Sequence, residues 1–170
     1  MTLTKKKSQV SVTKLNHVNI KANSVELFGG NAPSQESILT FESEALKFPQ
    51  IEIETTNLIH SGMYARTIMI PAGVAVVGAA MNNDSVCISS GDITVTTDDG
   101  SVRLTGYHVI PALSGKKRVG LAHQDTYWTS VFKSNANTVD EAEIEMTVEH
   151  EKLQTRMNLE LPSEIMQGIL

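Results

Sequence analysis

The chain has 170 residues, 41% of them hydrophobic and 19% charged, which is the balance of one soluble globular domain with an added arm or tail. With 14 Lys and Arg against 19 Asp and Glu, the net charge of −5 argues against a nucleic-acid binder, because such proteins carry a basic face. The single cysteine, Cys87, excludes an intrachain disulfide and a cysteine zinc cluster. We expect no membrane partner either, since no run approaches the roughly 18 apolar residues of a spanning helix and the polar start is no secretory signal.

Residues 1–33 predict an extended N-terminal arm, because nothing in them has helical periodicity. A basic tract is followed by short alternating apolar patches, and together these give the candidate partner-binding residues Lys5, Lys6, Lys7, Val10, Val12, Val18 and Ile20. One interpretation is a disordered tail, which is common for a basic terminus. The other is an assembly element whose patches add strands to the sheet edge of a partner.

A helix is predicted over residues 34–48. Ser34 can cap its N-terminus, and Glu36 lies in the first turn, where the helix dipole favours a negative charge. An apolar face at helical spacing follows, and Pro49 ends the helix. We interpret that face as packing on the domain.

From residue 51 to residue 132 the patterns predict short β-strands separated by turns. The strongest is a hairpin, in which Asp99 and Gly100 stand between two alternating runs. Strands of this length at roughly ten-residue spacing favour a sandwich or closed barrel over a parallel sheet. The fold class is therefore mainly β, with residues 34–135 as a barrel preceded by its helix.

Residues 136–170 are predicted as a C-terminal helix and tail. Thr138 and Glu141 form a capping box, and we expect the helix to run from Val139 to Met157. Strict alternation over residues 141–148 leaves a strand as the alternative. The tail beyond residue 158 carries scattered apolar residues that need a surface to cover.

Five short motifs then follow one another in order: residues 62–66 (GMYAR), 70–73 (IPAG), 90–92 (SGD), 115–120 (GKKRVG) and 122–129 (AHQDTYWT). The series covers about residues 55–132 and resembles the small cupin-like proteins encoded by tailed bacteriophages. The resemblance implies a double-stranded β-helix, a small jelly-roll barrel, and a phage origin. It implies no settled activity.

The chain departs from the metal-binding members of that family. They place a His-x-His pair and a Glu after the first Pro-x-Gly turn, whereas residues 78–88 here contain neither histidine nor glutamate. His123 alone remains, and one imidazole cannot hold a catalytic metal, which needs about three protein ligands. We expect no bound metal and no cofactor.

Candidate cavity or anion contacts are the polar and aromatic side chains within and around the barrel: His60, Tyr64, Arg66, His108, Arg118, His123 and Trp128. We interpret the basic run of Lys116, Lys117 and Arg118 as the exposed tip of a loop. The alternative is that these three side chains bind an anion. Strand alternation places His123 and Asp125 on one face. No serine lies in a Gly-x-Ser-x-Gly elbow, and we assign no catalytic residue.

Two functions remain. The first is a non-enzymatic virion accessory protein, a capsid decoration, cement or tail-associated protein. It would be made in the host cytoplasm, form a homo-oligomer (a dimer or trimer), and bind the major capsid or other virion proteins. The second is a small-molecule binder or degenerate cupin enzyme that uses the barrel cavity.

Overall fold

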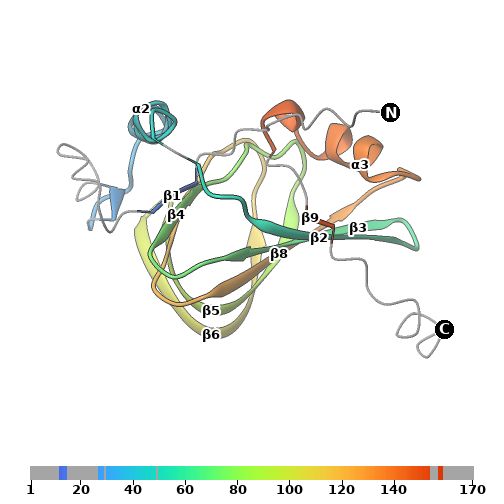
Figure 1. The fold of residues 1–170 in the computed structure, drawn as a ribbon. Helices are drawn as coiled ribbons and strands as arrows, with labels where there is room; N and C mark the ends of the chain where they lie inside the picture. The colour runs from blue at the N-terminus through green and yellow to red at the C-terminus, as the bar shows by residue number, and fades with distance from the viewer. Residues whose placement is uncertain (1–11, 15–26, 29, 49, 154–156, 159–170) are drawn as a thin grey trace.

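The computed structural model describes residues 12–14, 27–28, 30–48, 50–153 and 157–158 (Figure 1). Six of the predicted arm residues, Lys5, Lys6, Lys7, Val10, Val18 and Ile20, lie outside these ranges, as does the tail from residue 159. Within the described part of the chain, no helix is long and apolar enough to cross a membrane.

The predicted mainly β architecture is confirmed. The strands are β1 (Val12–Lys14), β2 (Glu54–His60), β3 (Met63–Ile70), β4 (Val74–Val77), β5 (Ser85–Thr97), β6 (Gly100–Ala112), β7 (Val119–Ala122), β8 (Thr126–Lys133) and β9 (Met157–Asn158). They form one curled sheet in the order β1-β4-β7-β5-β8-β3-β2-β9, with β6 paired to β5. All pairs are antiparallel except β2 with β9. Figure 1 shows the sheet bending round into a half-barrel, with helices α2 (Gln35–Ala45) and α3 (Val139–Met146) beside it.

The β5–β6 hairpin joins the two halves of the curled sheet. Its turn lies at Asp99 and Gly100, as predicted, and Gly100 has a φ of 131°, which a residue with a side chain rarely adopts. The first part of β5 pairs with β8 and the later part with β7. Between them Gly91 has a φ of 143° and lies so close to Thr126 that a Cβ atom would overlap it. Because Gly91 has no side chain, β8 can approach β5 closely at this point.

The main core fills the inner, concave side of the sheet. Ile70, Val74, Ile93, Val95 and Ala122 are among its buried residues. A second cluster lies outside the β4–β7 half, where α2 packs. There Leu27, Ile38 and Phe41 cover Val77 and Val119.

A third cluster closes the inner side near α3. The capping box predicted for this helix is confirmed, because Thr138 and Glu141 each bond the other's backbone N–H. The predicted length is wrong, since the helix ends at Met146 rather than Met157. Thr147 turns to an extended conformation and donates its hydroxyl to the carbonyl of Ala80, 2.6 Å away. A single 3₁₀ turn, η2 (His150–Lys152), follows.

The helix predicted over residues 34–48 is confirmed in place, with Ser34 as its N-cap and its last residue at Ala45.

The described part of the arm before this helix contributes to this chain's own fold. Val12, for which the sequence favoured a partner's sheet edge, lies opposite Val76 of β4. Leu27 is fully buried. The assembly role of the remaining arm stays a prediction.

Candidate functional site

A row of polar side chains crosses the inner face of the sheet. Neighbouring strands place Asn57, Arg66, Ser130 and Cys87 opposite one another in turn. Because alternate residues of a strand share a face, the adjacent rows bring Tyr64 on one side and Trp128, Ser89 and His108 on the other. The strands therefore assemble this row from four separate parts of the sequence.

Short contacts connect part of this row. The Tyr64 hydroxyl donates to Asn57 Oδ1 at 2.7 Å, and Cys87 Sγ lies 3.5 Å from Ser130 Oγ. From α3, the carboxylate of Glu143 reaches within 3.8 Å of Arg66 Nε, and both side chains are largely buried. In the described part of the chain, the buried atoms Asn57 Nδ2 and Ser89 Oγ find no hydrogen-bond partner.

Four of the seven predicted contact residues share this face: Tyr64, Arg66, His108 and Trp128. The structure does not bring the other three to it. His60 is exposed at the end of β2, Arg118 lies 3.4 Å from Asp98, and His123 Nε2 lies 2.8 Å from Thr94 Oγ1.

The expected pairing of His123 with Asp125 on one strand face is wrong. Both residues lie in the turn between β7 and β8, where strand alternation does not apply. Asp125 Oδ1 accepts instead from the backbone N–H of Ala72 at 2.9 Å. Each side chain thus fastens the turn to a different neighbour.

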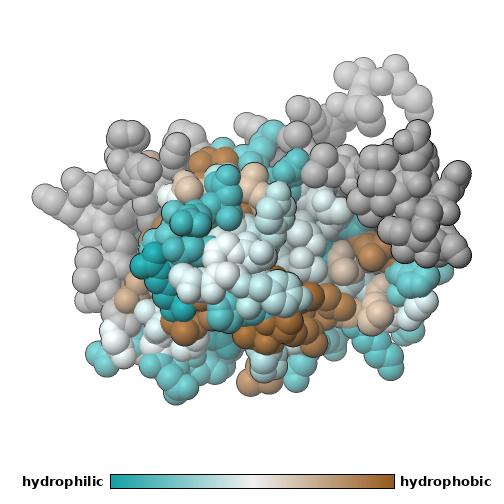
Figure 2. Space-filling view, turned by 90° about the horizontal axis from the view of Figure 1, so that it is seen from below, coloured by the Kyte–Doolittle hydropathy of each residue, from teal (hydrophilic) through white to brown (hydrophobic). Residues whose placement is uncertain are grey.

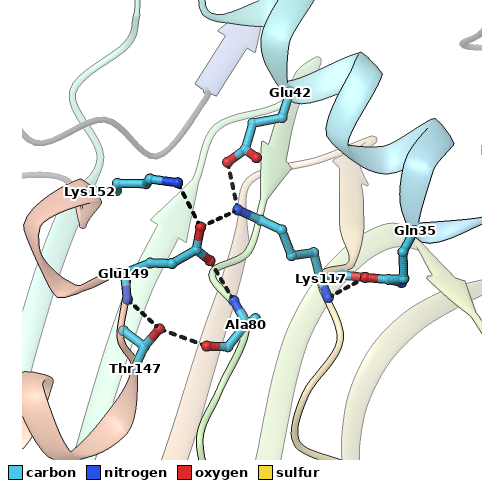
Figure 3. A network of polar contacts seen from close by, with 7 residues as sticks. All are labelled: Gln35, Glu42, Ala80, Lys117, Thr147, Glu149 and Lys152. Atoms are coloured by element: carbon cyan, nitrogen blue, oxygen red, sulfur yellow. Dashed lines mark hydrogen bonds and ion pairs between the residues drawn. The ribbon is translucent and has the colours of Figure 1, made fainter.

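Lys117 is buried and is no part of an exposed basic tip, which corrects the sequence interpretation, and Figure 3 shows its ammonium group between Glu42 and Glu149. The Lys117 side chain is 7% exposed, and its ammonium nitrogen lies 2.8 Å from a carboxylate oxygen of both Glu42 and Glu149. Its backbone N–H donates to Gln35 Oε1. The network joins α2 to the segment that follows α3, and its role is structural.

The carboxyl group of Glu149 has a strongly perturbed pKa. Burial acts to raise it, but hydrogen bonds from Lys117, Lys152 and the N–H of Ala80 together outweigh burial and lower the pKa to about 2. Lys116, the neighbour of Lys117, pairs with Asp98 at 3.0 Å in a half-exposed ion pair.

The inner face does not fit the metal that cupin folds are associated with. Its polar groups are one imidazole, one thiol, hydroxyls, an amide and the single carboxylate of Glu143, and that carboxylate lies beside the guanidinium of Arg66. No group of three or more His, Cys, Asp or Glu side chains is placed to hold a metal ion in the ranges that the structure describes.

The outer face of the same strands is apolar, and sequence reasoning missed it. One row across five strands is entirely apolar: Leu58, Ala65, Val131, Val86 and Pro111. The next row holds Thr56, Thr67, Thr129, Ile88 and Val109, and a third holds Glu54, Met69, Tyr127, Ser90 and Tyr107. These three rows, with the end row of His60, Met63 and Lys133, are called the outer apolar face below.

Large side chains of this face are exposed to solvent. The exposed fraction is 45% for Leu58, 46% for Val86 and 57% for Val109. Figure 2, a view from below, shows hydrophobic side chains gathered into a continuous patch among hydrophilic ones. At one border Arg103 and Asp92 form an ion pair at 2.7 Å, and the Arg103 hydrogen bonds lower the pKa of Asp92. Contiguous apolar surface of this kind marks an interaction site.

Solved structures similar to part of this chain include proteins described as cupins. KdgF from Halomonas sp. is 14% identical with a TM-score of 0.43, over 51% of this chain and 82% of that chain. A cupin-2 domain protein from Shewanella frigidimarina is 12% identical with a TM-score of 0.40, over 59% and 99%. A cupin superfamily protein from Desulfitobacterium hafniense is 11% identical with a TM-score of 0.42, over 55% and 87%.

No protein-family model and no curated protein matches the sequence. At this similarity the structural matches carry no argument about family or activity. The phage part of the sequence resemblance rests on the sequence motifs alone.

Proposed function

We propose that this chain is a non-enzymatic accessory protein of a bacteriophage particle, a decoration, cement or tail-associated protein. The observation that supports this role is the outer apolar face, a surface suited to bind protein rather than to convert a substrate. On the inner face, among the described residues, the cysteine is buried against Ser130 and the histidine bonds the carbonyl of Thr105, and we therefore assign neither of them a catalytic role in this proposal. The phage setting comes from the motif series in residues 55–132.

The test is the location of the protein in infected cells. We expect purified particles to contain it at a fixed ratio to the major capsid or tail protein, measured by quantitative mass spectrometry. A chain lacking residues 2–11 should fold but fail to load, if the basic arm is the anchor. The deletion stops before β1, because Val12 pairs with β4 and Leu27 belongs to the core. Recovery of the protein only from the lysate, and never from particles, would contradict the proposal.

A small-molecule binder is the second candidate, and the observation favouring it is the presence of two buried polar atoms on the inner face, Asn57 Nδ2 in the row of Arg66 and Ser89 Oγ in the next row. A guanidinium, an amide and a hydroxyl on one face are groups that bind a small carboxylate or phosphate. Thermal-shift measurements with such anions, on wild type and Ser89→Ala, test this. A shift that the variant loses would favour the binder, and no shift with any anion would remove it.

A further inference from the structure

The outer apolar face is covered by nothing in the described part of the chain, although the equivalent face of the other half of the sheet is covered. Outside β4 and β7, α2 and Leu27 bury Val77 and Val119. Outside β2, β3, β8, β5 and β6, the apolar rows stay exposed. Among the described residues, the β4–β7 half of the sheet therefore has a covering layer on its outer side, and the half formed by β2, β3, β8, β5 and β6 has none.

We propose that a second copy of this chain supplies that layer, by packing the same face against it about a two-fold axis. This inference rests on the proposed assembly function. Sheets stack face to face about 10 Å apart with their strands nearly aligned, and valine and threonine side chains interdigitate well in such a stack. A self-complementary face is what a two-fold dimer requires.

The placement of charge selects the second copy and its orientation. The two central rows, those of Val131 and Thr129, contain no charged residue. Lys133 and His60 lie at one end of the face, and Glu54 lies at the other. If the axis runs across the strands, between the Val131 and Thr129 rows, a copy turned end over end brings its Glu54 to His60 and its Tyr127 to Lys133.

The contacts in this orientation are favourable at both ends. A cation over an aromatic ring is attractive, as is a carboxylate that accepts a hydrogen bond from an imidazole N–H. An axis parallel to the strands would instead stack Lys133 on Lys133, a like-charge contact that opposes binding.

The size of the face sets the strength of the dimer. Strands about 4.8 Å apart and rows about 6.7 Å apart give five strands and four rows an area of roughly 20 by 20 Å. That is about half of the ~800 Å² per partner in a standard interface, which is the size typical of weak, reversible association. We expect a reversible dimer with a dissociation constant in the micromolar range.

Sedimentation equilibrium on the full chain, from about 1 to 200 μM, measures this association directly. Wild type should move from the 18.5 kDa of one chain toward twice that mass. Val86→Glu, which buries a charge at the centre of the dimer, should raise the dissociation constant by about tenfold or more. Val148→Glu is the matched control, because Val148 is 78% exposed and lies outside the face. A wild type that stays monomeric, or a Val86→Glu variant that dimerises as well as the control, would overturn the inference; circular dichroism checks that each variant folds.

Cross-linking tests the orientation separately. Met63 and Met69 lie at opposite ends of β3 and face each other only between copies turned end over end. A short bismaleimide should join a mixture of Met63→Cys and Met69→Cys chains, and should not join Met63→Cys to itself. The reverse pattern would overturn the axis. A dimer confirmed in solution, for a protein absent from particles, would refute the proposed function and leave this inference standing.

Discussion

Lys117 gives the sharpest test of what holds the helices to the sheet. The Lys117→Met variant keeps a side chain of similar length and removes the charge, which leaves Glu42 and Glu149 facing each other without the cation between them. Breaking a buried ion pair by removing one partner costs about 3–5 kcal/mol, because the remaining charge stays buried. In a domain of this size, each kcal/mol lowers the melting temperature by about 2–4 °C, so the expected loss is roughly 6–20 °C.

The neighbouring lysine provides the control. Lys116 forms an ion pair with Asp98 at 3.0 Å, and both side chains are half-exposed. Such a pair contributes about 0–1 kcal/mol, so Lys116→Met should melt within a few degrees of wild type. Differential scanning calorimetry of the three proteins at pH 7 decides the matter. If the two variants melt together, the network of Figure 3 does not stabilise the fold as argued.

The same network predicts how stability depends on pH. The pKa of Glu149 is about 2 in the folded chain against an ordinary 4.5, so its carboxylate favours the folded state above pH 4.5. This contribution is lost as the pH falls from 4.5 toward 2. Urea unfolding at pH 5 and pH 3 should show wild type losing about 1–2 kcal/mol more than Glu149→Gln over that interval, after allowance for partial exposure. Parallel losses in the two proteins would contradict the lowered pKa.

Three further predictions concern the glycines and metal content. Gly91→Ala should lower the free energy of unfolding in urea by about 2–4 kcal/mol, because its Cβ would overlap Thr126. The control is Gly106→Ala, whose Cβ would have no atom within 4 Å and which should cost about half as much. Equal losses in the two variants would refute the close approach of β8 to Gly91. Gly100→Val should cost about 1–3 kcal/mol, since φ is 131° and Gly30 O would lie 3.1 Å from the Cβ; an unchanged melting temperature contradicts this. Elemental analysis should find well under one equivalent of transition metal, and a stoichiometric metal that survives chelation would disprove the inner-face argument.

Features that depend on a few adjacent residues could be predicted from the sequence. Ser34 accepts from the N–H of Ser37 at 3.0 Å, and Thr138 pairs with Glu141, because capping is decided within one turn. The Asp99–Gly100 hairpin is equally local. The C-terminal end of α3 could not be predicted from the sequence, because it depends on the contact of Thr147 with Ala80, 67 residues away.

The candidate sites needed the strand order. Lys116 and Lys117 are chemically identical neighbours, yet the partners of Lys117 lie 75 and 32 residues away, and only the fold distinguishes the two. The inner row likewise depends on the register that sets Arg66 between Asn57 and Ser130. Alternation along one strand says which residues share a face and not which residues of other strands join them.

The outer apolar face did leave a trace in the sequence. Val86, Cys87 and Ile88 are consecutive apolar residues, as are Val131 and Phe132, and such runs are typical of strands covered on both sides. The structure covers the inner side of these strands and, among the described residues, leaves Val86 nearly half exposed on the outer side. Since a sheet with two apolar faces requires two covering layers, and α2 provides one only for the β4–β7 half, the run of apolar residues itself argues that another protein surface completes the fold.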